Sequence, residues 1–233
     1  MLEVTQLLAG RDFARAVSGS EKMSNFAYLV ADRRAGECVL VDPAWDVRGL
    51  IEIVASDKLK LLGAIATHGH WDHVGGRYGP LEIEGISQLA AQARVPVWAH
   101  ELERKRLLAT GIDPAWLRLV RDGDHLDLGT GAIRFLHTPG HTSGSQCLEV
   151  GGAVITGDTL FIDECGRVDL TGSDPDAMFN SLGKLAALPP ETLVYPGHDY
   201  GPNPAATIGE QKRTNPALRA RTLEEWRAFL AAP

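Results

Sequence analysis

The chain has 233 residues, 44% of them hydrophobic and 23% charged, with a formal net charge of −7 at pH 7 and a pI near 5.6. This ordinary globular composition allows a full core, and the acidic balance argues against a nucleic-acid partner, which needs a basic face. The three widely spaced cysteines exclude a disulfide framework, and no basic-then-apolar leader or long apolar run is present, so we expect a cytoplasmic protein without a membrane partner.

The first part of the chain alternates short apolar runs with helix-like segments. Residues 26–30 and 38–41 flank a turn that contains Gly36 and predict a hairpin. Apolar residues recur at helical spacing over 47–55, and the apolar run 61–66 predicts a buried strand. The same patterns then predict a helix over 85–93, a strand over 95–99 and a charged amphipathic helix over 101–109.

The second part is richer in strands. Strands are predicted over 126–128, 132–136, 146–150 and 153–155, with a last strand over 192–195. Ser173 or Asp174 caps a helix that extends to residue 188, and Thr222 begins a terminal helix through a capping box. The two halves have similar content, so we predict two sheets packed face to face and covered by helices.

The most informative segment is Thr67–His73, which follows the strand at 61–66 and reads Thr-His-Gly-His-Trp-Asp-His. Its three imidazoles and one carboxylate would cost stability at a strand end unless something bound them. Side chains two apart in an extended segment point the same way, so His68 and His70 can share one ion. Asp72 and His73 lie past the turn and can face a second ion.

Further ligand-type residues follow other strands, in the way a rigid scaffold presents ligands at one rim. They are Asp42, His141, Asp158 and His198. Asp158 is our candidate for a carboxylate that bridges two cations. The first predicted metal site then contains His68, His70, His141 and Asp158, and the second contains Asp72, His73, His198 and Asp158. Five of the eight histidines fall in these segments; we expect His100, His125 and His137 to lie on the surface or to support the ligands.

The combined motifs resemble the metallo-β-lactamase superfamily, most closely its glyoxalase II and persulfide dioxygenase branch. The resemblance runs from about Phe26 to Pro216. Besides the His-rich segment, it rests on Pro-Gly-His-Thr at 139–142, Gly-Asp-Thr-Leu-Phe at 157–161, Cys-Gly-Arg at 165–167 and Pro-Gly-His-Asp-Tyr at 196–200. It implies an α+β fold, a four-layer αββα sandwich with metals at the rim between the sheets, in which Asp42 supports the ligands from a buried position.

The resemblance also implies an activity. Two divalent metal ions, zinc first and iron or manganese as alternatives, would generate a hydroxide that attacks a thioester or related ester. Asp72 would orient this nucleophile or accept its proton. Arg167 and Tyr200 match positions that help to hold glutathione, so a small-molecule substrate such as a glutathione derivative is expected. A structural ion pair of Arg167 with Asp163 or Asp169 is an equal alternative, and Cys165 is expected to be a structural thiol.

The alternative function is a persulfide dioxygenase acting on glutathione persulfide. Residues 166–169 and 210–216 resemble that side of the branch. It would bind a single iron through His68, His141 and Asp158, the two-histidine, one-carboxylate arrangement of oxygen-activating iron enzymes. A non-catalytic binding module is a third reading, but none of the ligand positions is lost. Metal content and substrate separate the three.

We predict one domain over 1–233, with a helical insertion near 78–110 and a short helical tail over 205–233. The insertion follows from the distance between His73 and His141, which is longer than the pattern of the two close relatives suggests. It would add a helix or flap near the site and reshape specificity. Assembly as a homodimer is left open by the sequence.

Overall fold

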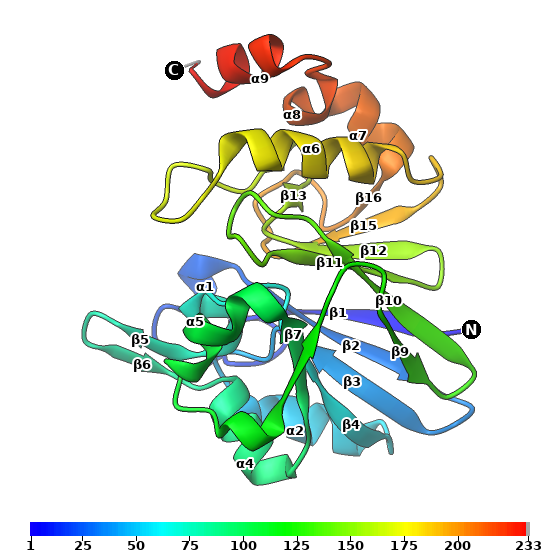
Figure 1. Ribbon diagram of the computed structural model, residues 1–233. Coiled ribbons are helices and arrows are strands. Elements are labelled where there is room, and N and C mark those ends of the chain that lie inside the picture. Colours follow the sequence, from blue (N-terminus) through cyan, green and yellow to red (C-terminus); the bar gives the residue numbers. More distant parts are fainter. Residues whose placement is uncertain (232–233) are drawn as a thin grey trace.

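The computed structural model describes residues 1–231 and contains two sheets packed face to face, with helices on both outer faces (Figure 1). This α+β arrangement is the predicted four-layer αββα sandwich. The N-terminal half forms one sheet and its helices, and the C-terminal half forms the other. The last two residues of the predicted tail lie outside the described part of the chain.

The first sheet has six strands in the order β1-β2-β3-β4-β7-β8. The strands are β1 (Glu3–Leu8), β2 (Phe26–Asp32), β3 (Glu37–Val41), β4 (Lys60–Ile65), β7 (Val97–His100) and β8 (Leu117–Val120). The pairs β1–β2 and β2–β3 are antiparallel, whereas β3, β4, β7 and β8 run parallel. Loops that follow these parallel strands therefore gather at one edge of the sheet.

The second sheet also has six strands, in the order β16-β15-β12-β11-β10-β9. The strands are β9 (His125–Leu128), β10 (Gly131–His137), β11 (Gln146–Val150), β12 (Ala153–Gly157), β15 (Leu193–Pro196) and β16 (Ala206–Thr207). Because β10 and β12 are both antiparallel to β11, and β12 is parallel to β15, the carboxyl ends of β10, β12 and β15 lie at the same edge.

The helices and small hairpins complete the layers. The elements of the first half are α1 (Ser20–Met23), α2 (Val47–Ser56), α3 (Trp71–Val74), the hairpin β5 (Gly76–Tyr78) and β6 (Leu81–Ile83), α4 (Ile86–Ala93), η1 (Glu101–Glu103), α5 (Arg104–Leu108) and η2 (Pro114–Trp116). Those of the second half are the hairpin β13 (Leu160–Phe161) and β14 (Glu164–Cys165), then α6 (Pro175–Ala186), α7 (Ile208–Thr214), α8 (Pro216–Arg219) and α9 (Leu223–Leu230).

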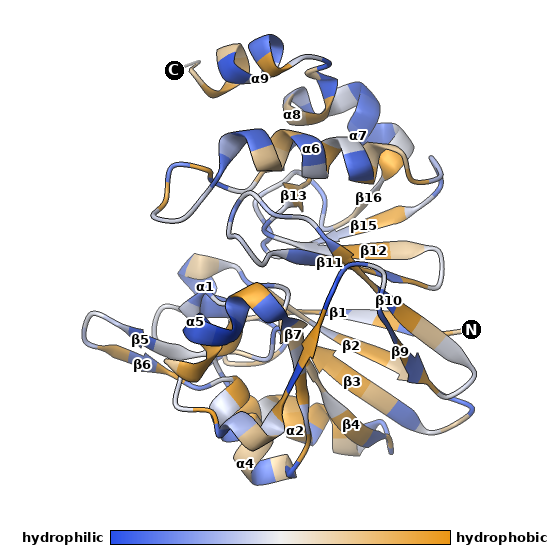
Figure 2. Ribbon diagram, viewed as in Figure 1, coloured by the Kyte–Doolittle hydropathy of each residue, from blue (hydrophilic) through white to orange (hydrophobic). Residues whose placement is uncertain are grey.

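Strand β2 shows how the sequence produces the layers. Successive side chains of a strand point to opposite faces. Phe26, Tyr28 and Val30 lie in the core between the two sheets, together with Phe135 and Ile155 of the second sheet. The intervening β2 side chains lie in the core under the helices of the first half. Both faces are buried, so the strand is hydrophobic up to Asp32 at its end, as Figure 2 shows for the inner strands.

The turns of two hairpins, one from each sheet, meet at Asp32. Its carboxylate accepts hydrogen bonds from the backbone N–H groups of Arg34 and Ala35 in the β2–β3 turn. It also accepts bonds of 2.7 Å from the backbone N–H and the hydroxyl of Thr130 in the β9–β10 turn. These hydrogen bonds hold the pKa of Asp32 well below its ordinary value. Asp32 therefore joins the two sheets at the edge where these turns lie.

Several elements of the fold were not predicted, among them β8 and the hairpins β5–β6 and β13–β14. No strand was predicted at the N-terminus, yet β1 pairs along its length with β2. The predicted last strand is followed by β16, which pairs with β15 over two residues. The segment 78–110 contains the helices α4 and α5 but also β6, which was not predicted, and β7, the predicted strand, which lies within the first sheet between β4 and β8. Whether that segment is an insertion stays a prediction.

Over the described chain, no helix combines the length and the apolar character needed to cross a lipid bilayer.

Candidate metal centre

The predicted ligands of both halves come together at the rim between the two sheets. His68 and His70 lie in the loop after β4, and Asp72 and His73 lie in the short helix α3 that follows. The remaining ligands, His141, Asp158 and His198, each follow the carboxyl end of a strand of the second sheet (β10, β12 and β15). The strand directions thus bring distant parts of the chain to one place.

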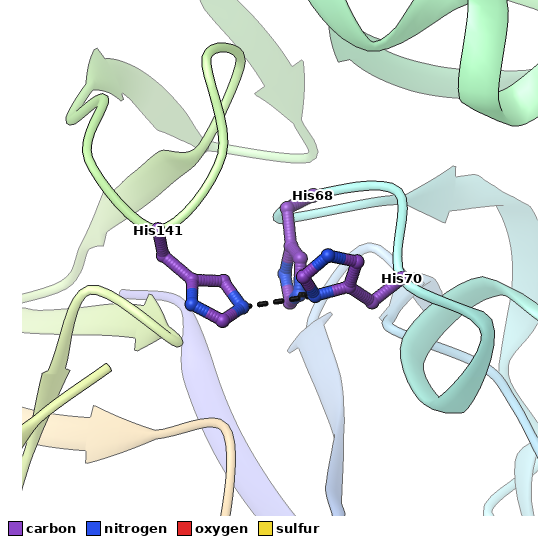
Figure 3. Close-up of side chains that lie close together, drawn as sticks. All are labelled: His68, His70 and His141. Carbon is purple, nitrogen blue, oxygen red and sulfur yellow. Dashed lines mark hydrogen bonds between the residues drawn. The ribbon is translucent and has the colours of Figure 1, made fainter. Parts of the chain in front are cut away.

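One group consists of three imidazoles (Figure 3). His70 Nδ1 lies 3.1 Å from His68 Nε2 and 2.9 Å from His141 Nε2. The three rings are nearly perpendicular to one another, with interplanar angles of 80° to 87°. Three nitrogens that converge in this way are a donor set for a metal ion.

A second group lies beside the first and contains Asp72, His73 and His198. The Nε2 atoms of the two histidines are 3.1 Å apart, and Asp72 Oδ2 lies 3.4 Å from His198 Nε2. All three side chains are buried. A carboxylate and two imidazoles again form a donor set.

Asp158 lies between the two groups. Its Oδ2 is 3.4 Å from His141 Nε2 and 3.5 Å from His198 Nε2, one histidine from each group, and its Oδ1 is 3.3 Å from His73 Nε2. Oδ1 is buried and has no hydrogen-bond partner among the described residues. A buried carboxylate oxygen of this kind is costly unless a cation compensates it.

The ring nitrogens that face away from the centre have partners of their own. His141 Nδ1 is 2.8 Å from the backbone oxygen of Arg167, and His198 Nδ1 is 2.8 Å from that of Met23. His73 Nδ1 is 2.9 Å from Asp42 Oδ2. Each contact favours a proton on the outward nitrogen, which leaves Nε2 free as a ligand.

Asp42 forms a third group with His68 and His73 by proximity, but its oxygens are already engaged. It accepts hydrogen bonds of 2.7 Å from the backbone N–H and the hydroxyl of Thr67, in addition to the contact with His73. Its φ of 50° is unusual for a residue other than glycine. We therefore interpret Asp42 as the residue that orients the His-rich loop rather than as a ligand.

The electrostatics of the centre separate the histidines into two kinds. Burial lowers the pKa of His68 well below its ordinary value, and burial together with His141 lowers that of His70 to about 4. Burial also opposes a charge on His198, but the negative charge of Asp158 outweighs it and raises the pKa to about 9. The pKa of His73 is also raised well above its ordinary value, because the negative charges of Asp158 and Asp72 outweigh the effect of burial.

The carboxylates respond in the opposite direction. Burial alone would raise the pKa of Asp72, but His73 and His198 lower it to about 2. Asp158 is likewise held well below its ordinary pKa, against burial, by His198 and His73. The centre thus keeps two ionised carboxylates among the imidazoles, and a divalent cation would compensate their charge.

The two predicted substrate-binding residues lie in different surroundings. Arg167 is exposed and forms an ion pair of 2.8 Å with Asp169, which is one of the structural pairings considered for it. Tyr200 is half-exposed and its ring stacks on that of His198, with centroids 4.6 Å apart. Burial, with Asp158 and Asp72 nearby, raises the pKa of Tyr200 to about 12. Tyr200 therefore lies beside the centre as a neutral phenol.

The structure adds two residues that the sequence analysis missed. Asn25 is buried, and its amide Nδ2 donates to Asp72 Oδ2 at 3.2 Å. Glu103 is also buried, and its Oε1 accepts hydrogen bonds from the hydroxyl of Thr142 at 2.6 Å and the backbone N–H of Gly144 at 3.0 Å. Neither residue belongs to a ligand motif, so no sequence signal pointed to them.

The other histidines and Cys165 lie outside the two donor groups. The rings of His100 and His137 stack with centroids 3.9 Å apart, and His125 is exposed. Burial, with His137 nearby, lowers the pKa of His100 to about 4. Cys165 is partly buried, and burial raises its pKa to about 12, which makes it a poor nucleophile.

Comparisons with known proteins agree with this geometry. The family model of the metallo-beta-lactamase superfamily matches residues 22–198. A hydroxyacylglutathione hydrolase from Ruegeria pomeroyi is 35% identical over 202 residues, covering 86% of this chain and 72% of the relative. The crystal structure of ETHE1 from Myxococcus xanthus superposes with a TM-score of 0.76 at 31% identity and covers 91% of this chain and 88% of that one. The structure of TTHA1623 in a di-iron-bound form gives a TM-score of 0.68 at 34% identity, covering 83% and 95%.

Proposed function

The chain belongs to the metallo-beta-lactamase superfamily, on the glyoxalase II and ETHE1 branch, and from this premise we propose that it is a metal-dependent hydrolase of a thioester or related ester. The observation that carries the proposal is the position of Asp158, whose oxygens approach histidines of both donor groups. A carboxylate so placed is suited to bridge two cations. A donor set of imidazoles and carboxylates also suits divalent metals.

Two divalent ions held there would supply Lewis-acid chemistry, activating a water molecule and polarising a carbonyl. The proposed ligands are His68, His70, His141 and Asp158 for one ion, and Asp72, His73, His198 and Asp158 for the other. No nucleophilic serine or cysteine is needed for hydrolysis by this route.

We assign Asp72 a second role as the residue that orients the attacking water or accepts its proton. Its carboxylate is ionised at neutral pH, because its pKa lies at about 2. Asn25 donates to one of its oxygens and limits its rotation. A fixed and ionised carboxylate beside the reacting water meets the geometric and protonation requirements of a general base.

The nature of the metal is part of the proposal. We propose zinc first, with iron or manganese as alternatives, because the nitrogen and oxygen donors suit all three. The likeness to a relative solved in a di-iron-bound form keeps iron in consideration. We further propose that the substrate is a small molecule such as a glutathione derivative, in line with the hydroxyacylglutathione hydrolase relative. Tyr200 and Arg167 are the proposed substrate contacts.

The likeness to ETHE1 favours a second candidate, a persulfide dioxygenase with one iron. His68, His141 and Asp158 would form its two-histidine, one-carboxylate site. The ligand positions do not separate the two functions, because the same residues serve both. The metal content and the type of reaction separate the two functions.

The test is elemental analysis of anaerobically purified protein, combined with assays on thioesters, lactones and glutathione persulfide. The hydrolase proposal expects about two ions per chain and thioester turnover without oxygen uptake. One iron per chain, with oxygen consumed on glutathione persulfide and no thioester hydrolysis, would establish the dioxygenase instead. Absence of bound metal in the anaerobically purified protein, together with no turnover of any of these substrates, would contradict both candidates.

A further inference from the structure

A cavity of about 310 Å³ opens beside His70, on the side of the centre formed by the first half of the chain. Its floor includes Gly75 and Gly76, which have no side chains to fill it. Its walls include Trp71, Arg77 of β5 and Arg106 of α5. His70 belongs both to this wall and to the three-imidazole group. The cavity therefore adjoins the candidate metal centre at His70, and its size is at the small end for ligand pockets.

The guanidinium of Arg106 is held in position by Thr171 and Glu103. Its Nη2 donates one long hydrogen bond of 3.3 Å to the backbone oxygen of Thr171. Its buried Nη1 has no hydrogen-bond partner among the described residues and stands 3.9 Å from Glu103 Oε2. Because Glu103 Oε1 is already engaged by Thr142 and Gly144, Glu103 is itself fixed. Arg106 therefore faces a buried carboxylate through Nη1 and bonds Thr171 through Nη2, and its Nε forms no hydrogen bond with the described residues and stays available.

Arg77 also lines the cavity; it is exposed and forms no ion pair with any residue in the described part of the chain. None of the described residues that line the cavity is acidic. Two arginines thus line a small cavity: Arg77 has no ion pair among the described residues, and Arg106 is held by Glu103 behind the wall. Such a pair is suited to an oxyanion, which arginine binds through paired N–H donors.

We propose that this cavity binds a carboxylate at the end of one arm of the substrate, with Arg77 and Arg106 as the specificity-determining residues. The inference rests on the proposed hydrolase function, because it places the scissile carbonyl at the metal centre and the acidic arm beyond His70. The cavity would then select acidic thioesters or esters over neutral ones. The carboxylate belongs either to the acyl arm or to the thiol arm.

Binding can be measured without catalysis. Glutarate and its neutral diamide are titrated by calorimetry into the metal-free full-length protein. We expect glutarate to bind and the diamide not to, with an affinity that falls as salt rises. Arg77→Gln should weaken glutarate binding about tenfold, the effect of one lost charge-assisted hydrogen bond. The matched control is Lys105→Gln, which removes an exposed cation from α5 outside the cavity and should change nothing. Equal glutarate affinity in wild type and Arg77→Gln would overturn the proposal.

Kinetics of the metal-loaded protein then decide between the two arms. Succinyl and succinamyl thioesters of N-acetylcysteamine differ only in a carboxylate on the acyl side. Butyryl thioesters of 3-mercaptopropionate and its amide differ only on the thiol side. We expect one acidic member to have a lower KM than its neutral partner, and Arg77→Gln to remove that preference. If no thioester is hydrolysed, the proposed function fails while the calorimetry still decides the cavity. If acidic and neutral members react alike, the carboxylate-specificity proposal is refuted.

Discussion

At the scale of single residues, Asp158 is the side chain on which both donor groups depend. Its oxygens lie within 3.5 Å of histidines from each group. Asp158→Ala should therefore empty both metal positions and abolish turnover, because each ion loses a shared ligand. Metal content measured by elemental analysis, with circular dichroism to confirm folding, checks this. Retention of two ions by the variant would refute the bridging assignment.

The control for that experiment is His100→Ala. His100 is a buried histidine of the same chain, but its ring stacks on His137 and lies in neither donor group. Its removal should leave the metal content unchanged, even where it lowers stability. A loss of metal in this variant would show that metal content follows general damage rather than ligand loss.

The ligand residues were accessible from the sequence because they occupy strand ends in short, dense motifs. Every residue of the two predicted sites lies within the same small region. Asn25 and Glu103 were not accessible in this way. Each reaches the centre through a tertiary contact across 47 and 39 residues of sequence, respectively. Such contacts leave no local pattern, because their partners are set by how the layers pack.

At the scale of elements, Asp32 links two hairpins that belong to different sheets. Asp32→Asn should lower the melting temperature at pH 7, because the amide cannot accept all of the hydrogen bonds that come from the two turns. The matched control is Asp127→Asn, which changes an exposed carboxylate of the neighbouring strand β9. Thermal unfolding of both variants checks the prediction, and equal melting temperatures would contradict it.

The same carboxylate predicts a pH dependence. The pKa of Asp32 in the folded protein lies below its ordinary value of 3.8, so ionised Asp32 stabilises the fold. Its contribution is complete above the ordinary value and is lost as pH falls through the lower, folded value. The difference in melting temperature between wild type and Asp32→Asn should therefore be largest near neutral pH and narrow below about pH 4. A difference that grew on acidification would have the wrong sign.

The terminal helix α9 is attached to α6 through Trp226. This indole is fully buried, and its Nε1 donates a hydrogen bond of 2.8 Å to the backbone oxygen of Pro175. Trp226→Ala should destabilise the fold by about 3–5 kcal/mol, the usual cost of removing a buried tryptophan. Trp226→Phe should cost less, since it keeps most of the apolar volume. Chemical denaturation measures both; a negligible loss for Trp226→Ala would mean that α9 is not part of the cooperative unit.

Elements with strong periodicity or clear caps were predicted well, whereas several short elements and the edge strands β1, β8 and β16 were not. Helix α2 lies where its apolar spacing placed it, and α6 begins after Asp174, one of the two caps considered. Strand β16 is only two residues long and exists through its pairing with β15. The hairpin β5–β6, which was not predicted either, pairs over only three residues. Short pairings of this kind depend on a partner strand rather than on their own residues.

At the scale of the whole molecule, the centre connects the two halves of the sandwich. Three of its proposed ligands follow strands of the second sheet, and the others follow β4 of the first. Bound metal should therefore stabilise the whole fold. Ions present at roughly a thousandfold excess over their dissociation constant would contribute about 4 kcal/mol, so a chelator should lower the melting temperature by roughly 10 °C. Recovery on adding metal back is the control, and no shift would argue against a metal that spans the halves.

The architecture as a whole was predictable because both its periodicities and its motifs point to the same fold. Residues that alternate along β2 do lie alternately between the sheets and under the helices. What the sequence could not supply is the cavity beside His70, since its walls come from β5 and α5. Their relative placement is decided by packing in the region that was predicted as a helical insertion.

Two imidazoles of the centre are oriented by hydrogen bonds to main-chain oxygens, those of Met23 and Arg167. A carbonyl of the backbone survives any exchange of the side chain it carries. Mutational drift at these two positions can therefore alter what the rim presents to solvent while the tautomers of His198 and His141 stay as they are. The side chains at these two positions can therefore change, and with them the contacts to a substrate, without altering the protonation of the two histidines.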